Sequence, residues 1–296
     1  MINNLEKEIP HIAFNSNKNM DFGIEVISIE SLVTKSKELK HDPEKPHQVA
    51  FNMILLFTEG KSKHLVDFVW HEVKENTLIH LSKGQINAFK FNVNLKGFLI
   101  LFTNEYLQNQ FNTLPEATIT HLLKSHLFSP KIEVLESSNV SVYIQLLNDE
   151  FYAGSDEINK RYTINFLFNI IFSKLEVLKR DQTTYTIKTE KLEVFLKFEA
   201  LLEENYMKSR NADFYAEKLN ITYKHLNVIS REITNNTIKQ FIDEFIVLEA
   251  KRKLINSSIR SNELAFLMGF SEPTNFIKYF KKMTGLTPKS FKNKHR

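Results

Sequence analysis

The 296-residue sequence contains no cysteine, and this absence excludes disulfide bonds, thiolate nucleophiles and cysteine-ligated zinc. Glycine and proline number only seven each, which excludes collagen-like and linker-dominated chains. No run of about 18 apolar residues occurs, so no membrane-spanning helix is predicted. Residues 1–10 also lack an apolar segment of signal-peptide length. We therefore expect a cytoplasmic protein with no membrane partner.

Positive charge is concentrated toward the C-terminus. Residues 188–296 contain 20 Lys and Arg against 13 Asp and Glu, a net charge of +7, whereas residues 1–187 contain 19 against 22. From Ala250 onward the count is 11 against 2. This distribution predicts a polyanionic partner at one end of the chain. The alternative from charge alone is a solvated, lysine-rich surface.

The first half of the sequence has the pattern of β-strands. Phe51–Thr58 is a nearly continuous apolar run, and His64–Val73 alternates as one strand would. Thr77–Leu81 and Phe98–Thr103 are further strand-like segments, with turn residues between them. Short strands at close spacing indicate an antiparallel sandwich or barrel.

The middle of the sequence changes to helical periodicity. Apolar residues recur at helical spacing in Val140–Phe151 and again in Ile158–Leu178, and they form a broad apolar face. Residues 181–189 are polar and contain four threonines, so we expect an interdomain linker there. From residue 190 onward, the pattern is helical with short turns.

Two segments of the C-terminal region repeat one another fifty residues apart. Residues 231–241 match residues 281–291 in a basic residue, two threonines, a lysine and a phenylalanine at the same offsets. Asn235 and Gly285 occupy equivalent positions in the repeat. A helix that ends at such a residue favours positive φ, which Asn and Gly tolerate.

A second parallel precedes each repeat. Ala216 and Ala265 each lie four residues before a turn residue, Asn220 or Gly269, and a hydroxyl residue follows two positions later at Thr222 or Ser271. A small residue lets two helices cross closely, and the hydroxyl can cap the next helix. One such pattern is often a plain helical hairpin. Two copies in a basic segment, joined by an amphipathic helix over residues 237–255, predict two helix-turn-helix units.

The second copy contains an extended signature, Leu264-Ala265-x-x-Met268-Gly269-Phe270-Ser271-Glu272-Pro273-Thr274-Asn275-Phe276, followed by Phe280-Lys281-Lys282-x-Thr284-Gly285-Leu286-Thr287-Pro288 and Phe291. With these residues the sequence resembles the AraC/XylS-type transcriptional regulators, strongly over residues 190–296. Lys45-Pro46-His47 and Gly84-Gln85-Ile86 resemble, more weakly, the cupin-like sensor domain that often precedes this module.

The resemblance implies an α+β fold. An N-terminal cupin-like β-barrel with a helical dimerisation segment would precede an all-α C-terminal domain with two helix-turn-helix units. The implied domains are a cupin-like sensor domain at 1–138, a helical dimerisation segment at 139–180, a linker at 181–189 and an AraC-type double helix-turn-helix DNA-binding domain at 190–296.

The resemblance also implies which residues would meet DNA. The recognition helices would be Tyr223–Thr234 and Glu272–Thr284, placed in successive major-groove segments of one duplex. The candidates for base contacts are Lys224, Asn227, Val228, Pro273, Thr274 and Lys278. The candidates for phosphate contacts are Thr222, Arg231, Ser271, Asn275, Lys281 and Lys282. Phenylalanines in the same region, including Phe241 and Phe276, have core spacing and are not expected to stack on bases.

The N-terminal half offers weaker signals. The candidate residues for an effector pocket are Phe51, Phe57, Trp70 and Phe89, although filling the barrel core is the favoured role for them. A metal-binding cupin needs an HxH pair and a later His. Here His47-Gln48-Val49 and Asn87 stand at those positions, and His71 and His80 are expected to be half-buried strand residues. We therefore expect no metal, no cofactor and no catalytic residues.

The sequence thus predicts a non-enzymatic, sequence-specific transcription regulator. The expected partners are double-stranded promoter or operator DNA, a small-molecule effector and a second copy of the chain, with RNA polymerase as a further candidate. An alternative keeps DNA binding but makes the N-terminal half a ligand-free dimerisation or partner module, and another is a cupin metalloenzyme. The effector, the operator and the choice between activation and repression stay open.

Overall fold

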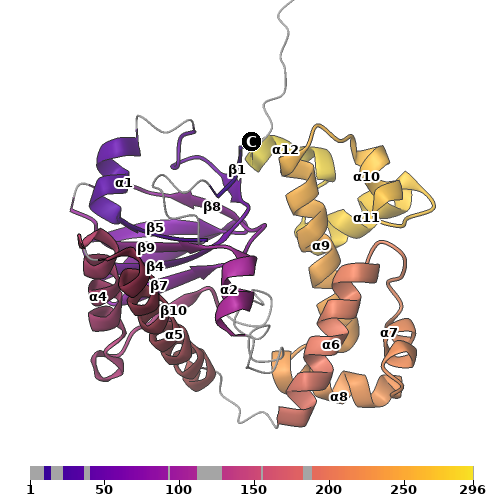
Figure 1. Cartoon of the computed structure of the whole chain (residues 1–296). Coiled ribbons are helices and arrows are strands. Elements are labelled where there is room, and N and C mark those ends of the chain that lie inside the picture. Colours follow the sequence, from indigo (N-terminus) through magenta and orange to yellow (C-terminus); the bar gives the residue numbers. More distant parts are fainter. Residues whose placement is uncertain are drawn as a thin grey trace, which may run out of the picture. The chain divides into compact units, whose positions relative to one another are not determined.

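The computed structural model describes residues 10–14, 23–36, 41–92, 94–111, 129–154, 156–182 and 189–295. The chain forms two compact units that divide between Thr184 and Tyr185. We call them the N-terminal unit and the C-terminal unit and describe each by itself. Strands and helices occupy the first and helices the second, so the predicted α+β class is confirmed (Figure 1). None of the described helices is long and apolar enough to cross a membrane.

The N-terminal unit contains two five-stranded sheets and helices beside them (Figure 1). The first sheet has the order β1-β3-β8-β5-β6, and the second has the order β10-β7-β4-β9-β2. The strands are β1 (His11–Ile12), β2 (Ile24–Ser28), β3 (His47–Val49), β4 (Asn52–Glu59), β5 (Lys61–Val66), β6 (Val69–Lys74), β7 (Thr77–Leu81), β8 (Ile86–Phe89), β9 (Lys96–Phe102) and β10 (Lys131–Glu133). The helices of this unit are α1 (Ile29–Lys35), α2 (Asn104–Gln110), α4 (Val140–Tyr152) and α5 (Glu157–Gln182).

The second sheet is buried on both faces, which explains the continuous apolar run in β4. Leu55 and Phe57 face the first sheet and belong to an apolar core between the two sheets. Ile54 and Leu56, which alternate with them, pack against α4 and α5 in a second core. A strand covered on both faces has no reason to alternate polar with apolar residues.

The expectation of one strand over His64–Val73 is wrong. The chain reverses at Asp67 and Phe68, so that β5 and β6 form an antiparallel hairpin. Both turn residues have positive φ, 43° and 72°, as the twist of a two-residue hairpin turn requires. The Asp67 carboxylate accepts hydrogen bonds from Gln85 Nε2 at 2.7 Å and from the Ile86 N–H at 3.2 Å. These distant partners hold a turn that lacks the usual Gly, so local sequence gave no signal for it.

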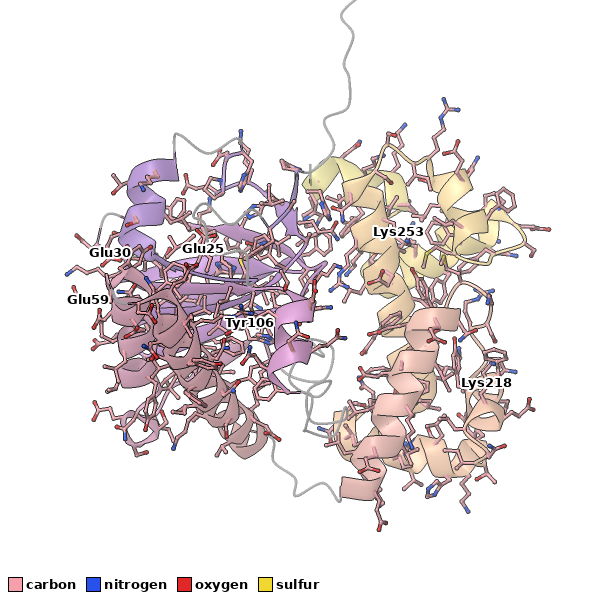
Figure 2. The ribbon with its side chains drawn as sticks, in the orientation of Figure 1. Glu25, Glu30, Glu59, Tyr106, Lys218 and Lys253 are labelled. Carbon is pink, nitrogen blue, oxygen red and sulfur yellow. The ribbon has the colours of Figure 1, made fainter. Side chains whose placement is uncertain are left out.

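The two middle helices have both a buried and an exposed apolar face. α5 buries Ile164 and Phe168 against the second sheet and α4. Tyr106 on α2, which is labelled in Figure 2, donates its hydroxyl hydrogen to Asn165 Oδ1 on α5 at 2.9 Å, and this bond ties the two helices together. On its outer side α5 exposes Ile158, Tyr162, Phe166 and Ile170 at four-residue spacing, and the neighbouring α4 exposes Val142 and Leu146. We call these six residues the outer stripe.

The described part of the C-terminal unit is entirely helical. Its helices are α6 (Thr189–Asn205), α7 (Ala212–Lys218), α8 (Tyr223–Thr234), α9 (Ile238–Asn256), α10 (Ser261–Leu267), α11 (Pro273–Thr284) and α12 (Pro288–His295). The phenylalanines expected in the core are buried, among them Phe241, Phe276 and Phe280. The predicted linker lies largely outside the described residues, because α5 runs to Gln182 and α6 begins at Thr189.

Candidate nucleic-acid interface

The first helix-turn-helix unit consists of α7 and α8. Ala216 on α7 is buried, and Asn220 has a φ of 54° in the turn that follows. Thr222 caps α8, because its Oγ1 accepts a hydrogen bond from the His225 N–H at 3.2 Å. The alanine, turn residue and capping hydroxyl therefore play the parts that the sequence predicted.

The second unit consists of α10 and α11 and uses a different start. Ala265 is fully buried and Gly269 has a φ of 76°, as expected for the close crossing and the turn. However, Ser271 does not cap α11. The N-cap is Glu272, without a side-chain cap bond, and Pro273 occupies the first turn. Proline already fixes the helical φ and has no N–H to satisfy, so this helix begins without a capping hydroxyl.

Both recognition helices end as the repeat predicted. Asn235 ends α8 with a φ of 62°, and Gly285 ends α11 with a φ of 76°. At each end, the N–H of this residue bonds to the carbonyl oxygen of the basic residue four positions earlier, Arg231 or Lys281. The left-handed conformation lets the chain turn at once into the next helix.

Helix α9 holds the two units together. It packs against α8 and also against α10 and α11. At its N-terminus, the Ile238 N–H donates to Asn227 Oδ1 of α8 at 3.1 Å. Further along, Asp243 Oδ1 accepts a hydrogen bond from the Tyr279 hydroxyl of α11 at 3.0 Å. Each recognition helix is therefore bonded directly to the same central helix.

Outward faces of α8 and α11 are polar and basic. Four exposed lysines lie on these faces, namely Lys224, Lys278, Lys281 and Lys282. Among the residues that the structure describes, none of the four forms an ion pair. Their buried faces pack through residues such as Leu226 and Phe280. Two amphipathic helices with free lysines on their outer faces can bind phosphate and base edges of a duplex.

Residues 215–294 match the protein family described as "Helix-turn-helix domain". The chain contains an AraC-type helix-turn-helix domain.

Two relatives match parts of this chain. The uncharacterised HTH-type transcriptional regulator in the cgkA 5' region of Pseudoalteromonas carrageenovora is 34% identical over 91 residues, which are 31% of this chain and 54% of the relative. The raffinose operon transcriptional regulatory protein RafR of Pediococcus pentosaceus is 21% identical over 176 residues, 59% of this chain and 63% of the relative. The chain thus spans less than two thirds of each relative's length.

A similar solved structure matches across both the N-terminal unit and the C-terminal unit. The crystal structure of ToxT from Vibrio cholerae with a bound unsaturated fatty acid has a TM-score of 0.46 and 10% identity, and the match covers 94% of this chain and 96% of that chain.

Within the helix-turn-helix domain, the structure places the predicted base-contact residues on the outer surface, with two exceptions. Lys224, Val228, Thr274 and Lys278 are exposed, whereas Asn227 and Pro273 are half-buried. The predicted phosphate-contact residues are all exposed, namely Thr222, Arg231, Ser271, Asn275, Lys281 and Lys282. The hydrogen bond from Ile238 occupies one lone pair of Asn227 Oδ1, a use that helical spacing alone could not reveal.

The effector-pocket candidates do not share one location. Phe51, Phe57 and Phe89 lie in the apolar core between the two sheets of the N-terminal unit. Trp70 is 43% exposed and alternates with His71 on β6, so its ring lies on the opposite face of the first sheet. Lys90 Nζ lies 5.6 Å from the Trp70 ring centroid.

Histidines of the N-terminal unit divide between two surfaces. His71 is half-buried as expected, but His80 is only 4% exposed because α5 covers its face of the second sheet. Lys179 Nζ of α5 lies 2.8 Å from His80 Nδ1. The described residues contain no group of three His, Asp or Glu side chains placed to hold a metal ion.

Sequence reasoning missed a polar set on the inner face of the first sheet. His47, His64 and Asn87 are almost fully buried there. Strand alternation alone gives no reason to group them, because β3, β5 and β8 are distant in sequence. Only the register of the sheet brings them onto one face.

Proposed function

We propose that this chain is a sequence-specific DNA-binding transcription regulator of the AraC type. The observation that carries the proposal is the pairing of two recognition helices, α8 and α11, bonded to one central helix with their basic faces exposed. A helix of this kind fits the major groove, and two of them in one rigid body can read two neighbouring groove segments. The names of the relatives as transcriptional regulators support the same activity.

Base reading falls to Lys224, Asn227 and Val228 on α8 and to Pro273, Thr274 and Lys278 on α11. The bond from Ile238 to Asn227 Oδ1 limits what Asn227 can read. Two-point pairing with adenine needs both the oxygen and the nitrogen of the amide, and here Oδ1 has one lone pair left to accept while Nδ2 can donate to a base acceptor. Val228 offers a methyl contact to thymine. Among the base-contact candidates of α11, Lys278 has the longest side chain and reaches guanine acceptors.

Phosphate contacts come from Thr222, Arg231, Ser271, Asn275, Lys281 and Lys282. Such contacts set the position of the domain on the duplex and make affinity fall with salt, without choosing sequence.

A small-molecule effector bound by the N-terminal unit controls this activity in our proposal. The core between the two sheets includes Phe51, Phe57 and Phe89. RNA polymerase is the further partner through which a bound regulator would act on transcription.

The same regulator is proposed to act as a homodimer through the outer stripe. Phe166 is 66% exposed and Ile158 67%, although both lie on a helix whose other face is fully packed. Large apolar groups gathered in one patch favour contact with another protein surface. A second copy presents the same stripe, so two copies can bury it against each other around a two-fold axis.

The decisive experiment is selection of bound sequences from a random DNA pool with the full-length protein. We expect enrichment of sites with two conserved segments about 10 base pairs apart, one helical turn. Affinity for the enriched site should fall steeply with salt and exceed affinity for a scrambled site. Equal affinity for every sequence would refute the proposal, and so would binding that ignores salt.

A further inference from the structure

The loop between α6 and α7, residues 206–211, lies against the second helix-turn-helix unit (Figure 1). We call it the junction loop. Its Met207 carbonyl oxygen is so close to Gly269 that a Cβ at Gly269 would lie 2.3 Å from it. Further along the loop, the Arg210 guanidinium lies over the ring of Phe270. The junction loop leads into the first unit and contacts the turn of the second, so it lies between the two units.

Hydrogen bonds hold the backbone of the junction loop in one conformation. The N–H groups of Lys208 and Ser209 both donate to the Asn205 carbonyl oxygen, at 2.8 and 3.0 Å. The Ser209 carbonyl oxygen accepts a hydrogen bond from the Tyr215 hydroxyl of α7 at 2.7 Å. The backbone next to Arg210 is therefore ordered before any ligand binds, which lowers the entropy cost of binding.

The junction loop presents two positive charges to solvent. Lys208 and Arg210 are both exposed, and within the described part of the chain neither forms an ion pair. A guanidinium that stacks through its flat face keeps its N–H donors around the edge, where they match the oxygens of a phosphate. The stack on Phe270 therefore orients the Arg210 side chain without using the groups that would bind an anion.

Arg210 also lies beside the side of α11 that contains two proposed phosphate contacts. The Phe270 ring under Arg210 has its centroid 5.3 Å from that of the Tyr279 ring. Tyr279 follows Asn275 by four residues and precedes Lys282 by three, and residues at these spacings share one side of a helix. Asn275 and Lys282 are both exposed. The junction loop thus extends a polar and basic side of the second recognition helix toward the first unit.

The shape of duplex DNA determines what such a loop would face. When two recognition helices enter successive major-groove segments on one face of a duplex, the minor groove crosses that face between them. The phosphates of both strands border this groove, in the spacer that separates the two segments. A basic loop between the two helix-turn-helix units is the part of the chain that would face these phosphates.

We propose that the junction loop is a third DNA contact, in which Lys208 and Arg210 bind phosphates of the spacer between the two major-groove segments. Arg210 pairs with phosphate oxygens through the edge of its guanidinium, and Lys208 pairs through its ammonium. These contacts, together with those of α8 and α11, hold the two segments at one separation. The inference rests on the proposed function and deepens it, since it names a binding element outside both helix-turn-helix units.

Salt dependence of DNA binding gives the first test. Fluorescence anisotropy is measured for the full chain with a selected duplex at several salt concentrations. Lys208→Ala and Arg210→Ala should each reduce the slope of log Kd against log salt by about 1, without changing base preference in either segment. Lys197→Ala is the control, because Lys197 is an exposed lysine earlier on α6, and its slope should equal that of the parent. Parent-like slopes in both loop variants would overturn the proposal.

Neutral linkages in the duplex give the second test. A methylphosphonate removes the charge of one phosphate at a time, first through the spacer and then within a major-groove segment. We expect the parent chain to bind less tightly at one or more spacer positions, and Lys208→Ala and Arg210→Ala to show no further loss there. In a major-groove segment, both variants should lose affinity as the parent does. A parent chain that tolerates every neutral spacer linkage would contradict the proposed contact.

This comparison also separates a DNA contact from an effect on folding. Arg210→Ala removes the stack on Phe270 as well as a charge, whereas Lys208→Ala leaves that stack in place. A general loss of structure would weaken binding at every linkage position alike. If Lys208→Ala kept the full spacer effect of the parent, the loop would have a structural role only, and the proposal would fall.

The result is distinct from that of DNA selection, because phosphate contacts do not depend on sequence. The salt slopes can therefore be measured with a scrambled duplex as well. Reduced slopes of the two loop variants, in a chain that selects no sequence, would support the junction loop and refute the regulator. Selective DNA binding with unchanged slopes would do the reverse.

Discussion

The Arg210 guanidinium lies over the Phe270 ring, 3.7 Å from its centroid. Arg210 belongs to the loop between α6 and α7, whereas Phe270 belongs to the turn between α10 and α11. The loop that leads into the first helix-turn-helix unit is thus in direct contact with the second unit, and this contact adds to those made by the shared helix α9. A stacked guanidinium is worth about 0.5–2 kcal/mol, depending on how far it is desolvated.

The same loop also packs against Gly269. A Cβ at Gly269 would lie only 2.3 Å from the Met207 carbonyl oxygen, so a side chain cannot fit without moving the loop. The turn that positions α11 is therefore set against backbone that precedes α7. This contact helps to fix the position of α11 relative to α8. A DNA site with two segments would require such a fixed position of the two recognition helices.

Replacing Gly269 with alanine should cost more stability than its conformation alone explains. Gly269 and Gly285 have the same φ of 76°, but a Cβ at Gly285 meets nothing within 4 Å. We expect Gly285→Ala to lower the free energy of unfolding by about 1–2 kcal/mol, the cost of a left-handed alanine. Gly269→Ala should lower it clearly further and should also weaken DNA binding. Urea unfolding of both variants measures the difference, and equal losses would show that the Met207 contact does not matter.

Two lysines on α11 should affect DNA binding in different ways. Lys278→Ala should weaken the selected site by about 1–3 kcal/mol and relax preference at one base pair, if Lys278 reaches a base edge. Lys282→Ala should weaken all sequences alike and reduce the salt slope by about 1, as loss of a phosphate contact does. Fluorescence anisotropy with selected and scrambled duplexes at several salt concentrations separates these outcomes. Exchange of the two behaviours would reverse our assignment.

Much of the helix-turn-helix domain was predictable because its determinants are local. A small residue, a turn residue and a cap act within one or two helical turns, so Ala216, Asn220 and Thr222 could be recognised from spacing alone. The exception, Ser271, shows the limit of that approach. The sequence offers two ways to begin this helix, a capping hydroxyl at Ser271 and a proline in the first turn at Pro273. The helix begins with Glu272 at the N-cap and Pro273 in the first turn, and the Ser271 hydroxyl does not cap it.

Features that depend on sheet register were not predictable. The turn at Asp67 is stabilised by Gln85 and Ile86, which lie in another part of the chain. Trp70 reads as a pocket residue in the sequence, yet the hairpin directs it to the outer face. A shift of one residue in a strand exchanges its faces, so no local pattern could decide either case.

Charge placed in the outer stripe should separate the proposed dimer. Phe166→Glu puts a carboxylate at the centre of the stripe, where burial against a second copy would strip its hydration. We expect light scattering coupled to size exclusion to show dimers of the parent chain and monomers of this variant. Phe266→Glu is the control, since Phe266 is a similarly exposed phenylalanine, 59% against 66%, on α10 of the other unit. A dimeric Phe166→Glu variant would place the interface elsewhere.

A buried lysine should give the N-terminal unit an unusual dependence on pH. Lys179 is 4% exposed, and burial lowers its pKa from 10.5 to about 7. Burial also lowers the pKa of its neighbour His80, and the charge of Lys179 lowers it further. Both groups therefore bind protons less readily in the folded state than in the unfolded chain, in which Lys179 keeps its ordinary pKa.

This difference makes the free energy of unfolding rise with pH. Below about pH 7 Lys179 is charged in both states and its titration adds no slope, whereas between about pH 7 and 10.5 the unfolded chain holds a proton that the folded chain has lost. Stability should therefore increase from neutral to alkaline pH, and Lys179→Met should flatten that increase while raising stability at neutral pH, where the buried charge costs most. Urea unfolding at several pH values measures both effects, with Lys174→Met on the same helix as the control. An unchanged slope in Lys179→Met would mean that Lys179 keeps its proton when folded, held by an anionic neighbour.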